Sequence, residues 1–521
     1  MAIIGSGIAG SVIAWLLASR GHRVEVFEKG PDYAYPHRPQ FEEQVLYDFF
    51  DTGTRLPPDL QNLVATGAYR QDLDAERTMV VGGSAVRWGG MSERFAPADL
   101  RTGSLYGLGV DWPIDYAALE PYYCKAEQLL GVSGSDEGDP FAAPRSQPYP
   151  LPPFELSSDT RLLAERLRRA GIALGTSPQA RARLEFDGRP GCANIGSCET
   201  CPIGARYSPN HHLLRAIATG NCRLRTETSV RRIVLDASGS ARAIVCRGNG
   251  EAGDTEHGAR LIVLAAGAIE SVRLLLLSAQ GTHSDGLGNS AGHLGQHFLL
   301  HHVHAGHFDY PEALYPGRTG AELAQSRQFI DPPTRGRHGG VLFQLPSMAS
   351  LWHHLGGLER WPRWRTGADV VESLRPLRAC EGAWLHSEPG PSPDKFVGLS
   401  DRRDRFGDRF AHVHYQPNAF DEETYRFAQG ITERVAQATG AIGFSLQPAR
   451  EFTSGHHHIG GCRMAASPAT GVVDSFGALF GVPNLYLSGS STFAGATALH
   501  PTLTIAALAV RTAELLAERL Q

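Results

Sequence analysis

The first 30 residues constrain the fold most strongly, because they place a glycine-rich turn between a buried strand and a helix. Residues 2–4 are apolar, Gly5-Ser6-Gly7-Ile8-Ala9-Gly10 follows, and residues 11–19 have helical character. A second strand at 23–27 alternates apolar and polar residues and ends at Glu28. A strand, G-x-G-x-x-G, a helix and a second strand ending in an acid form the dinucleotide-binding βαβ fingerprint.

Each part of this segment has a physical role in holding a dinucleotide. Gly5 permits the tight turn, Gly7 lets the backbone approach a pyrophosphate, and Gly10 lets the helix pack on the strand. The N–H groups around Ser6 and the positive end of the helix dipole favour phosphate. Glu28 can accept hydrogen bonds from ribose hydroxyls and would repel a 2′-phosphate. The segment predicts dinucleotide binding without distinguishing FAD from NAD.

Length and charge exclude several classes of protein. A chain of 521 residues is too long for one simple core, so we expect two domains. A net charge of −5 offers no basic field for nucleic acid, and no run of about 18 apolar residues predicts a transmembrane segment. The apolar start has no charged n-region, so we expect a cytoplasmic protein without a signal peptide. The first strand is short, and we expect the natural start to lie slightly upstream.

The rest of the chain predicts a cofactor domain that is interrupted by a second domain. A second glycine-rich loop covers 80–91, and strands and helices of α/β type are predicted at 260–278 and 485–520. Between them, stretches such as 340–344 and 410–415 alternate as in antiparallel sheets. We therefore predict an α/β fold with a discontinuous Rossmann-like domain and a substrate domain built on an antiparallel sheet. The predicted bounds are 1–110, 205–300 and 455–521 for the first domain, and 111–204 and 301–454 for the second.

Several blocks together resemble the glucose–methanol–choline family of oxidoreductases. They include the fingerprint, the Gly82-Gly83 loop, the segments 111–127, 264–271 and 401–407, the run His457-His458-Ile459-Gly460-Gly461-Cys462-Arg463-Met464, and 484–510. Their order spans nearly the whole chain. The resemblance implies FAD rather than NAD, and hence a Rossmann-like FAD-binding domain.

The resemblance also implies further cofactor contacts and the mode of attachment. They come from the second glycine-rich loop, the strand end near 266, a Ser-Gly-Ser segment and the start of the last helix: Gly82, Gly83, Ser84, Trp88, Gly89, Ala266, Gly267, Gly489, Ser490, Pro501 and Thr502. Relatives that bind flavin covalently have a histidine directly before the loop tryptophan. Arg87 stands there and cannot form that bond, so we expect non-covalent FAD.

Two histidines are implied as the catalytic pair. By resemblance, they are His457, six residues before the Arg-Met pair, and His500, directly before Pro501-Thr502-Leu503-Thr504. Oxidation of an alcohol removes the hydroxyl proton while hydride leaves the carbon, and a neutral imidazole is a suitable base near neutral pH. We assign His457 as the base and His500 as its partner, with the exchanged roles still open. For His456 and His458 we expect structural roles.

Three cysteines within ten residues, Cys192, Cys198 and Cys201, form the remaining cluster. The segment resembles one that holds a [3Fe–4S] cluster in bacterial FAD-dependent glucose dehydrogenases, although the last spacing here is one residue shorter. Zinc with His211 or His212 as a further ligand is an alternative. A local disulfide and reduced thiols are the simpler readings of the same pattern.

The resemblance predicts an FAD-dependent enzyme that oxidises a hydroxyl group of a polyhydroxy substrate, such as a sugar, a glycoside or an aminoglycoside intermediate. The electron acceptor stays open between oxygen, a soluble acceptor and onward transfer through a cluster. A flavin-containing lyase of the hydroxynitrile-lyase type is the alternative, because the same family includes such enzymes. A flavin-binding subunit without turnover is a third reading, which the two histidines disfavour.

Overall fold

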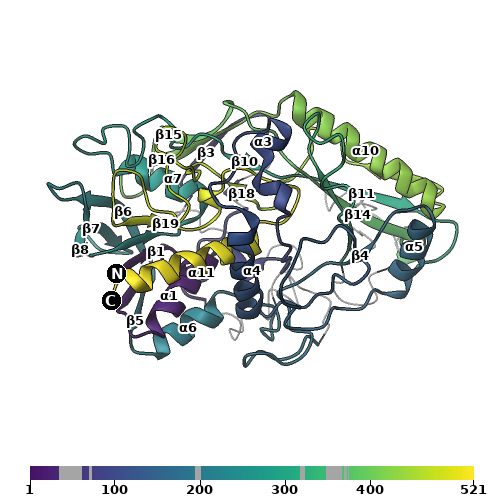
Figure 1. Ribbon diagram of the computed structural model, residues 1–521, viewed down its shortest axis with the longest axis horizontal. Coiled ribbons are helices and arrows are strands. Elements are labelled where there is room, and N and C mark those ends of the chain that lie inside the picture. The colour runs from purple at the N-terminus through teal and green to yellow at the C-terminus, as the bar shows by residue number, and fades with distance from the viewer. Residues whose placement is uncertain are drawn as a thin grey trace.

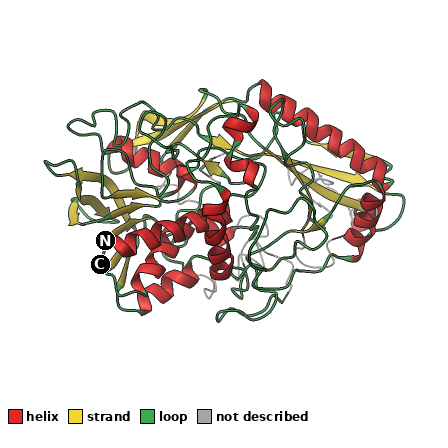
Figure 2. Ribbon diagram, viewed as in Figure 1, coloured by secondary structure: helices red, strands yellow, loops and turns green. Residues whose placement is uncertain are grey.

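The computed structural model describes residues 1–33, 61–69, 73–74, 76–193, 201–316, 323–347, 367–368, 372 and 375–521. Within these residues the fold is α/β, as the sequence predicts, and it is built on a parallel and an antiparallel sheet (Figures 1 and 2). The sequence indicates surface loops in two tryptophan-containing pieces, around 352 and at 361–365, and both pieces lie outside the described residues.

A five-stranded parallel sheet forms the core of the cofactor half. Its strand order is β19-β9-β1-β2-β5, and every neighbouring pair runs parallel. Strands β1, β9 and β19 are short, wholly buried and rich in Ile, Val and Leu, as expected for a sheet that is covered on both faces. The strands are β1 (Ala2–Ile4), β2 (Val24–Phe27), β5 (Cys222–Arg225), β9 (Ile262–Leu264) and β19 (Leu485–Leu487).

Helices and a small sheet cover the parallel sheet. On one side α1 packs between α6 and α11, and α4 packs on α11 (Figure 1). On the other side α7 contacts β6, the first strand of an antiparallel three-stranded sheet. These elements are α1 (Ile8–Ala18), α4 (Tyr116–Leu130), α6 (Asn210–Ala218), α7 (Gly267–Leu277), α11 (Thr502–Arg519), β6 (Thr228–Leu235), β7 (Ala241–Gly248) and β8 (Thr255–Gly258).

A six-stranded antiparallel sheet forms the other half, in the order β17-β11-β14-β13-β12-β4. Helices α5 and α10 cover one face of it, where side chains such as Leu163 and Val435 pack against Phe343 and Leu385. The elements are β4 (Gly175–Thr176), β11 (His302–Asp309), β12 (Ala324–Ser326), β13 (Val341–Leu345), β14 (Cys380–Ser387), β17 (Gly443–Leu446), α5 (Ser158–Arg169) and α10 (Ala419–Thr439).

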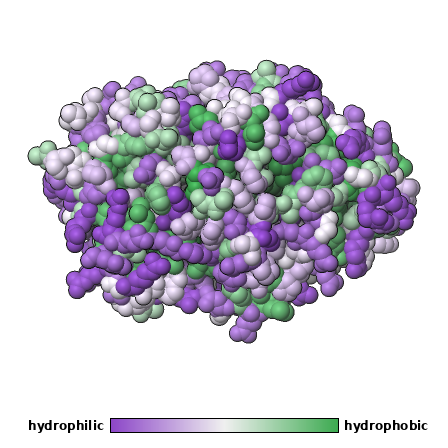
Figure 3. Space-filling model, viewed as in Figure 1, coloured by the Kyte–Doolittle hydropathy of each residue, from purple (hydrophilic) through white to green (hydrophobic). Residues whose placement is uncertain are grey.

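Shorter elements connect the two large sheets. The strands are β3 (Leu63–Gly67), β10 (Leu299–Leu300), β15 (Lys395–Arg403), β16 (Arg409–Tyr415) and β18 (His458–Ile459), and the helices are η2 (Gly83–Arg87), η3 (Pro97–Leu100), α3 (Thr102–Tyr106), η5 (Arg375–Ala379) and η6 (Ser490–Thr492). The surface in Figure 3 intersperses hydrophilic and apolar residues, with hydrophilic side chains gathered over α5. Among the described helices, none combines the length and the apolar character needed to cross a bilayer.

A buried ionic cluster joins the antiparallel sheet to the segment that follows the second glycine-rich loop. Arg335 Nη2 lies 2.7 Å from Asp99 Oδ1 in η3, and Arg335 Nε lies 3.0 Å from Glu388 Oε2, directly after β14. The Arg335 side chain is fully buried. Because a buried guanidinium is tolerated only when carboxylates surround it, this cluster fixes the position of the sheet against η3.

Candidate active site

The predicted cofactor residues gather at the carboxyl edge of the parallel sheet. The strand order reverses between β1 and β9, and such a switch point forms a ligand crevice outside the strand ends. Gly5 follows β1, Glu28 follows β2, Ala266 and Gly267 follow β9, and Gly489 follows β19. The structure therefore brings residues from distant parts of the chain to one edge.

The three glycines of the fingerprint differ in their surroundings. Gly5 has φ of +99°, and a Cβ there would lie 2.5 Å from the carbonyl oxygen of Ala265. A Cβ on Gly10 would collide with the carbonyl oxygen of Gly5. A Cβ on Gly7 would meet no atom within 4 Å, and α1 begins there without a side-chain cap. The space over Gly7 and the uncapped N–H groups fit the pyrophosphate of FAD.

The second glycine-rich loop lies directly against the first. The Gly82 N–H donates to Ser6 Oγ at 3.0 Å, and a Cβ on Gly83 would lie 3.2 Å from the Cα of Gly7. Trp88 is fixed by its indole N–H, which donates to the carbonyl oxygen of Tyr207 at 2.8 Å. The loop, with Ser84 and Gly89, is therefore placed to cover the same crevice.

Glu28 is held by the first turn itself. Its Oε2 accepts the Ser6 hydroxyl at 2.6 Å and the Ser6 N–H at 3.1 Å, and its Oε1 accepts the Gly30 N–H at 3.0 Å. Burial raises the pKa of this carboxyl, and its hydrogen bonds oppose the rise. The carboxylate therefore stabilises the turn. Its contact with a ribose stays a prediction, and such a contact would use the remaining lone pairs of the carboxylate oxygens.

The end of β19 links the cofactor edge to the histidine segment. The Gly460 N–H donates to the Ser490 carbonyl at 2.8 Å, and the Cys462 N–H donates to the Ser491 carbonyl at 2.9 Å. Within the described chain, the buried hydroxyls of Ser488 and Ser491 have no hydrogen-bond partner. Unpaired buried hydroxyls beside the crevice fit the polar edge of a bound flavin nucleotide. Nearby, Pro501 and Thr502 begin α11, which also has no side-chain cap.

His457 and His500 meet, although 42 residues separate them. Their ring centroids are 5.2 Å apart, and the two rings are perpendicular. His500 precedes the first turn of α11, and His457 precedes β18. Two imidazoles at this spacing can contact one small group between them, as the oxidation of a hydroxyl requires.

Two further histidines, His301 and His386, complete a buried cluster. The His301 Nδ1 lies 2.8 Å from the His457 Nδ1, and the His386 ring lies 4.6 Å from the His500 ring. Burial lowers the pKa of His301 to about 3 and holds the pKa values of His386 and His457 well below the usual 6.5, and neighbouring imidazoles act in the same direction. These rings are therefore neutral near pH 7 and can accept a proton.

Glu93 stands behind His500. Its Oε2 lies 3.0 Å from the His500 Nδ1, and its side chain is fully buried. An ionised carboxylate only accepts hydrogen bonds, so it holds the His500 proton on Nδ1 and fixes the ring orientation. Sequence reasoning missed Glu93, although it lies only two residues after the glycine-rich loop.

Comparison with known proteins agrees with this geometry. Residues 60–303 and 391–509 match the two family models described as GMC oxidoreductase, and residues 3–43 match a model described as NAD(P)-binding Rossmann-like domain. The chain belongs to the glucose–methanol–choline (GMC) oxidoreductase family. It is therefore an FAD-dependent enzyme acting on CH–OH groups, as the sequence predicts.

Relatives align along nearly the whole GMC chain. The fructose dehydrogenase large subunit of Gluconobacter japonicus is 28% identical, with 98% of this chain and 96% of the relative covered. The 6'''-hydroxyparomomycin C oxidase of Streptomyces lividus is 31% identical, with 99% and 91% covered. The crystal structure of pyridoxine 4-oxidase from Mesorbium loti has the same fold, with a TM-score of 0.67, 18% identity, and 99% and 98% covered.

The neighbours of the predicted catalytic pair in this GMC chain make hydrogen bonds within the protein. His458 Nε2 lies 3.1 Å from Glu76 Oε2, and His456 Nδ1 lies 3.2 Å from the Glu76 carbonyl oxygen. Glu76 also accepts hydrogen bonds from Tyr69 and Ser454. This network fixes the backbone around His457.

The cysteine cluster of this GMC chain is only partly described. Cys198 lies outside the described residues, Cys201 is buried, and Cys192 is partly buried. His211 and His212, the alternative zinc ligands, contact protein partners instead: His211 Nε2 lies 3.0 Å from Asp187 Oδ2, and His212 Nδ1 lies 2.9 Å from the Tyr207 hydroxyl. The comparisons give the iron–sulfur hypothesis no support, and it stays a prediction.

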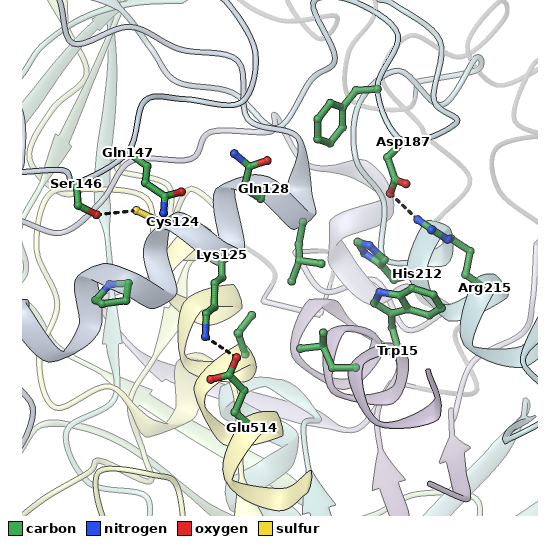
Figure 4. A pocket seen from close by; sticks show the side chains of 15 residues that line it. Trp15, Cys124, Lys125, Gln128, Ser146, Gln147, Asp187, His212, Arg215 and Glu514 are labelled. Atoms are coloured by element: carbon green, nitrogen blue, oxygen red, sulfur yellow. Dashed lines mark hydrogen bonds and ion pairs between the residues drawn. The ribbon is translucent and has the colours of Figure 1, made fainter. Parts of the chain in front are cut away.

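A pocket of about 630 Å³ lies elsewhere on this GMC enzyme, over α1, α4, α6 and α11 (Figure 4). Trp15 and Gln128 line it, and the pairs Lys125–Glu514 and Asp187–Arg215 stand at its sides. The histidine cluster does not line this pocket.

Proposed function

We propose that the enzyme oxidises one hydroxyl group of a polyhydroxy substrate, a sugar, a glycoside or an aminoglycoside intermediate, to a carbonyl. The observation that carries the proposal is the perpendicular pair of His457 and His500 at 5.2 Å. Two relatives that align along the chain support the substrate class, since one is named for fructose and one for hydroxyparomomycin. FAD, when bound at the glycine loops, supplies the hydride acceptor.

His457 is the base in this proposal. Its Nδ1 faces the His301 Nδ1 at 2.8 Å, so one of the two rings donates and the other accepts. When His457 donates from Nδ1, its Nε2 carries a lone pair and takes the hydroxyl proton. His301 thus positions the base, and burial keeps both rings neutral before the proton arrives.

His500 holds the substrate oxygen in this proposal. Glu93 accepts its Nδ1 proton and fixes the ring, so its Nε2 side is available to the substrate. The Glu93 carboxylate favours a second proton, on Nε2 of this ring, and in that form the ring donates to the substrate oxygen and stabilises its growing negative charge as the hydroxyl loses its proton. Arg87, which stands directly before Trp88, cannot form a covalent bond to the flavin, and in this proposal FAD is held non-covalently.

The test is anaerobic addition of sugars, amino sugars and simple alcohols to the purified holoprotein, with the flavin absorption recorded. We expect the flavin to bleach with one polyhydroxy substrate. Substrate turnover with a flavin that stays oxidised would contradict alcohol oxidation and favour the lyase. A His457→Asn variant that binds FAD but bleaches as fast as the parent would contradict the assignment of the base.

A further inference from the structure

The two faces of the six-stranded sheet differ in chemistry. Side chains that alternate along β13 and β14 point to opposite faces, because the period of a strand is two. Phe343, Leu385 and Ala383 lie in the apolar cluster under α5 and α10. The alternate positions form what we call the inner face: Gln325 on β12, Leu342 and Gln344 on β13, and Trp384 and His386 on β14.

The inner face is directed towards the catalytic histidines. Leu342, which pairs with His386, belongs to the hydrophobic cluster of the cofactor half rather than to the one under α10. The His386 ring lies 4.6 Å from the His500 ring and 6.2 Å from the His457 ring. Side chains on this face therefore border the place where a substrate hydroxyl is oxidised.

Three polar side chains of the inner face are buried with unsatisfied atoms. Within the described chain, neither ring nitrogen of His386 has a hydrogen-bond partner, and the same holds for Gln325 Nε2 and Gln344 Oε1. The exposed fractions are 5% for His386, 1% for Gln325 and 0% for Gln344. We call these three residues the polar row. Unsatisfied buried polar atoms are costly and rare, so a row of them beside an active site points to a ligand.

The rest of the row is ordered by hydrogen bonds. Gln344 Nε2 donates to Gln325 Oε1 at 3.3 Å, and the Ser177 hydroxyl donates to the same oxygen at 2.5 Å. These contacts orient both amides and leave the NH₂ group of Gln325 and the carbonyl oxygen of the Gln344 side chain for another molecule. The neutral imidazole of His386 adds one donor and one acceptor.

We propose that the polar row is a second hydroxyl-binding subsite, which holds a ring polyol by hydroxyl groups other than the one that is oxidised. A hydroxyl donates and accepts, so it can satisfy every unpaired atom of the row, whereas a carboxylate only accepts and an ammonium only donates. The subsite rests on the proposed function, since the oxidised hydroxyl lies at His457 and His500. It makes His386 a residue that determines specificity.

The test uses the FAD-loaded enzyme with His386→Leu and Gln344→Met, which remove polar atoms at similar volume. A sugar that bleaches or binds is compared with analogues in which single hydroxyls are replaced by hydrogen. We measure equilibrium binding by calorimetry and kcat/KM from flavin reduction. We expect His386→Leu to lower affinity and kcat/KM by roughly 10- to 100-fold for the parent sugar. With His386→Leu, one deoxy analogue should bind and react as well as the parent sugar, because the hydroxyl contact that this analogue lacks is already absent from the variant.

A stability measurement separates this role from a structural one. His386 has no hydrogen-bond partner in the described structure, so His386→Leu should keep or raise the thermal unfolding temperature while kcat/KM falls. The control is His414→Leu on β16, a partly exposed histidine of another sheet, which should leave kcat/KM unchanged. A fall in kcat/KM that parallels a fall in unfolding temperature would overturn the subsite.

Other outcomes separate the subsite from the proposed function. If the loss of affinity caused by His386→Leu and the loss caused by each deoxygenation multiply independently, none of these hydroxyl groups contacts His386. The proposed subsite is then wrong. If simple alcohols reduce the flavin as well as sugars and His386→Leu has no effect, oxidation stands and the subsite falls. If sugars bind in a His386-dependent manner but the flavin stays oxidised, the subsite stands and the proposed function falls.

Discussion

Replacement of Glu93 by glutamine should slow flavin reduction without weakening the fold. The variant keeps the shape of the side chain and removes its charge, so the His500 Nδ1–H would donate to a neutral amide oxygen instead of a carboxylate at 3.0 Å. A hydrogen bond to a charged group is roughly twice as strong as a neutral one, a difference of about 1.4 kcal/mol. If that difference is expressed in the transition state, the rate constant falls about tenfold.

The fold should respond in the opposite direction. In the described chain Glu93 has one oxygen on His500 and a second, buried oxygen without a partner. Because burying a charge with a single partner is costly, the neutral side chain should leave the unfolding temperature unchanged or raise it. A rate that falls while stability is kept is the expected signature of a group that positions His500.

Anaerobic stopped-flow absorption at the flavin band measures the rate constant, and differential scanning calorimetry measures the unfolding temperature. The matched control is Asp187→Asn, which removes the charge from another carboxylate–histidine pair, at 3.0 Å from His211 and remote from the cluster. The control should reduce its flavin at the parental rate. An unchanged rate in Glu93→Gln would refute the reasoning, as would a loss of rate that a loss of stability fully explains.

Four further predictions follow from described contacts. His457→Asn should bind FAD but lower the rate of flavin reduction by about 10²- to 10⁴-fold in stopped-flow measurements. Gly7→Ala should fold, since a Cβ at this position would meet no atom within 4 Å, but should purify with less of the visible absorption of FAD. Arg335→Met should leave two buried carboxylates unpaired and lower the free energy of unfolding by about 3–5 kcal/mol in urea titrations. Burial lowers the pKa values of His301 and His302 to about 3. Below pH 6.5 the unfolded chain therefore binds more protons than the folded chain. The free energy of unfolding should decrease as the pH is lowered from 6.5 to 3, by about 1.4 kcal/mol per pH unit for each ring.

Local sequence patterns predicted those parts of the fold whose geometry is determined by one short segment. The turn from Gly5 to Gly10 forces its own geometry, since a side chain at either end would collide with backbone. The family, and with it the meeting of His457 with His500, was predicted from a resemblance that rests on the order of several blocks, in which each histidine stands at a fixed place in its own motif. The predicted domain bounds and cofactor contacts stay predictions.

The rest of the cluster could not be predicted because it depends on how distant segments pack. His386 lies in a strand, and whether it faces the core or the active site depends on the register of β14 against β13 and β11. The pairing of His386 with Leu342 on β13 and with Val303 on β11 determines which way its side chain faces. No local sequence pattern contains this pairing. Glu93 had one usable signal, an acid two residues after a cofactor loop, but its partner His500 lies 407 positions away.

The alternation of the antiparallel sheet has a consequence for how this enzyme can diversify. Alternate side chains of β13 and β14, from Val341 to Leu345 and at Ala383 and Leu385, pack under α5 and α10, and the positions between them lie on the inner face. Selection on substrate preference can therefore act on one set of residues while selection on foldability acts on the other. A library randomised at Leu342, Gln344, Trp384 and His386 alone should yield folded variants at high frequency, and the same number of changes at the intervening positions should not.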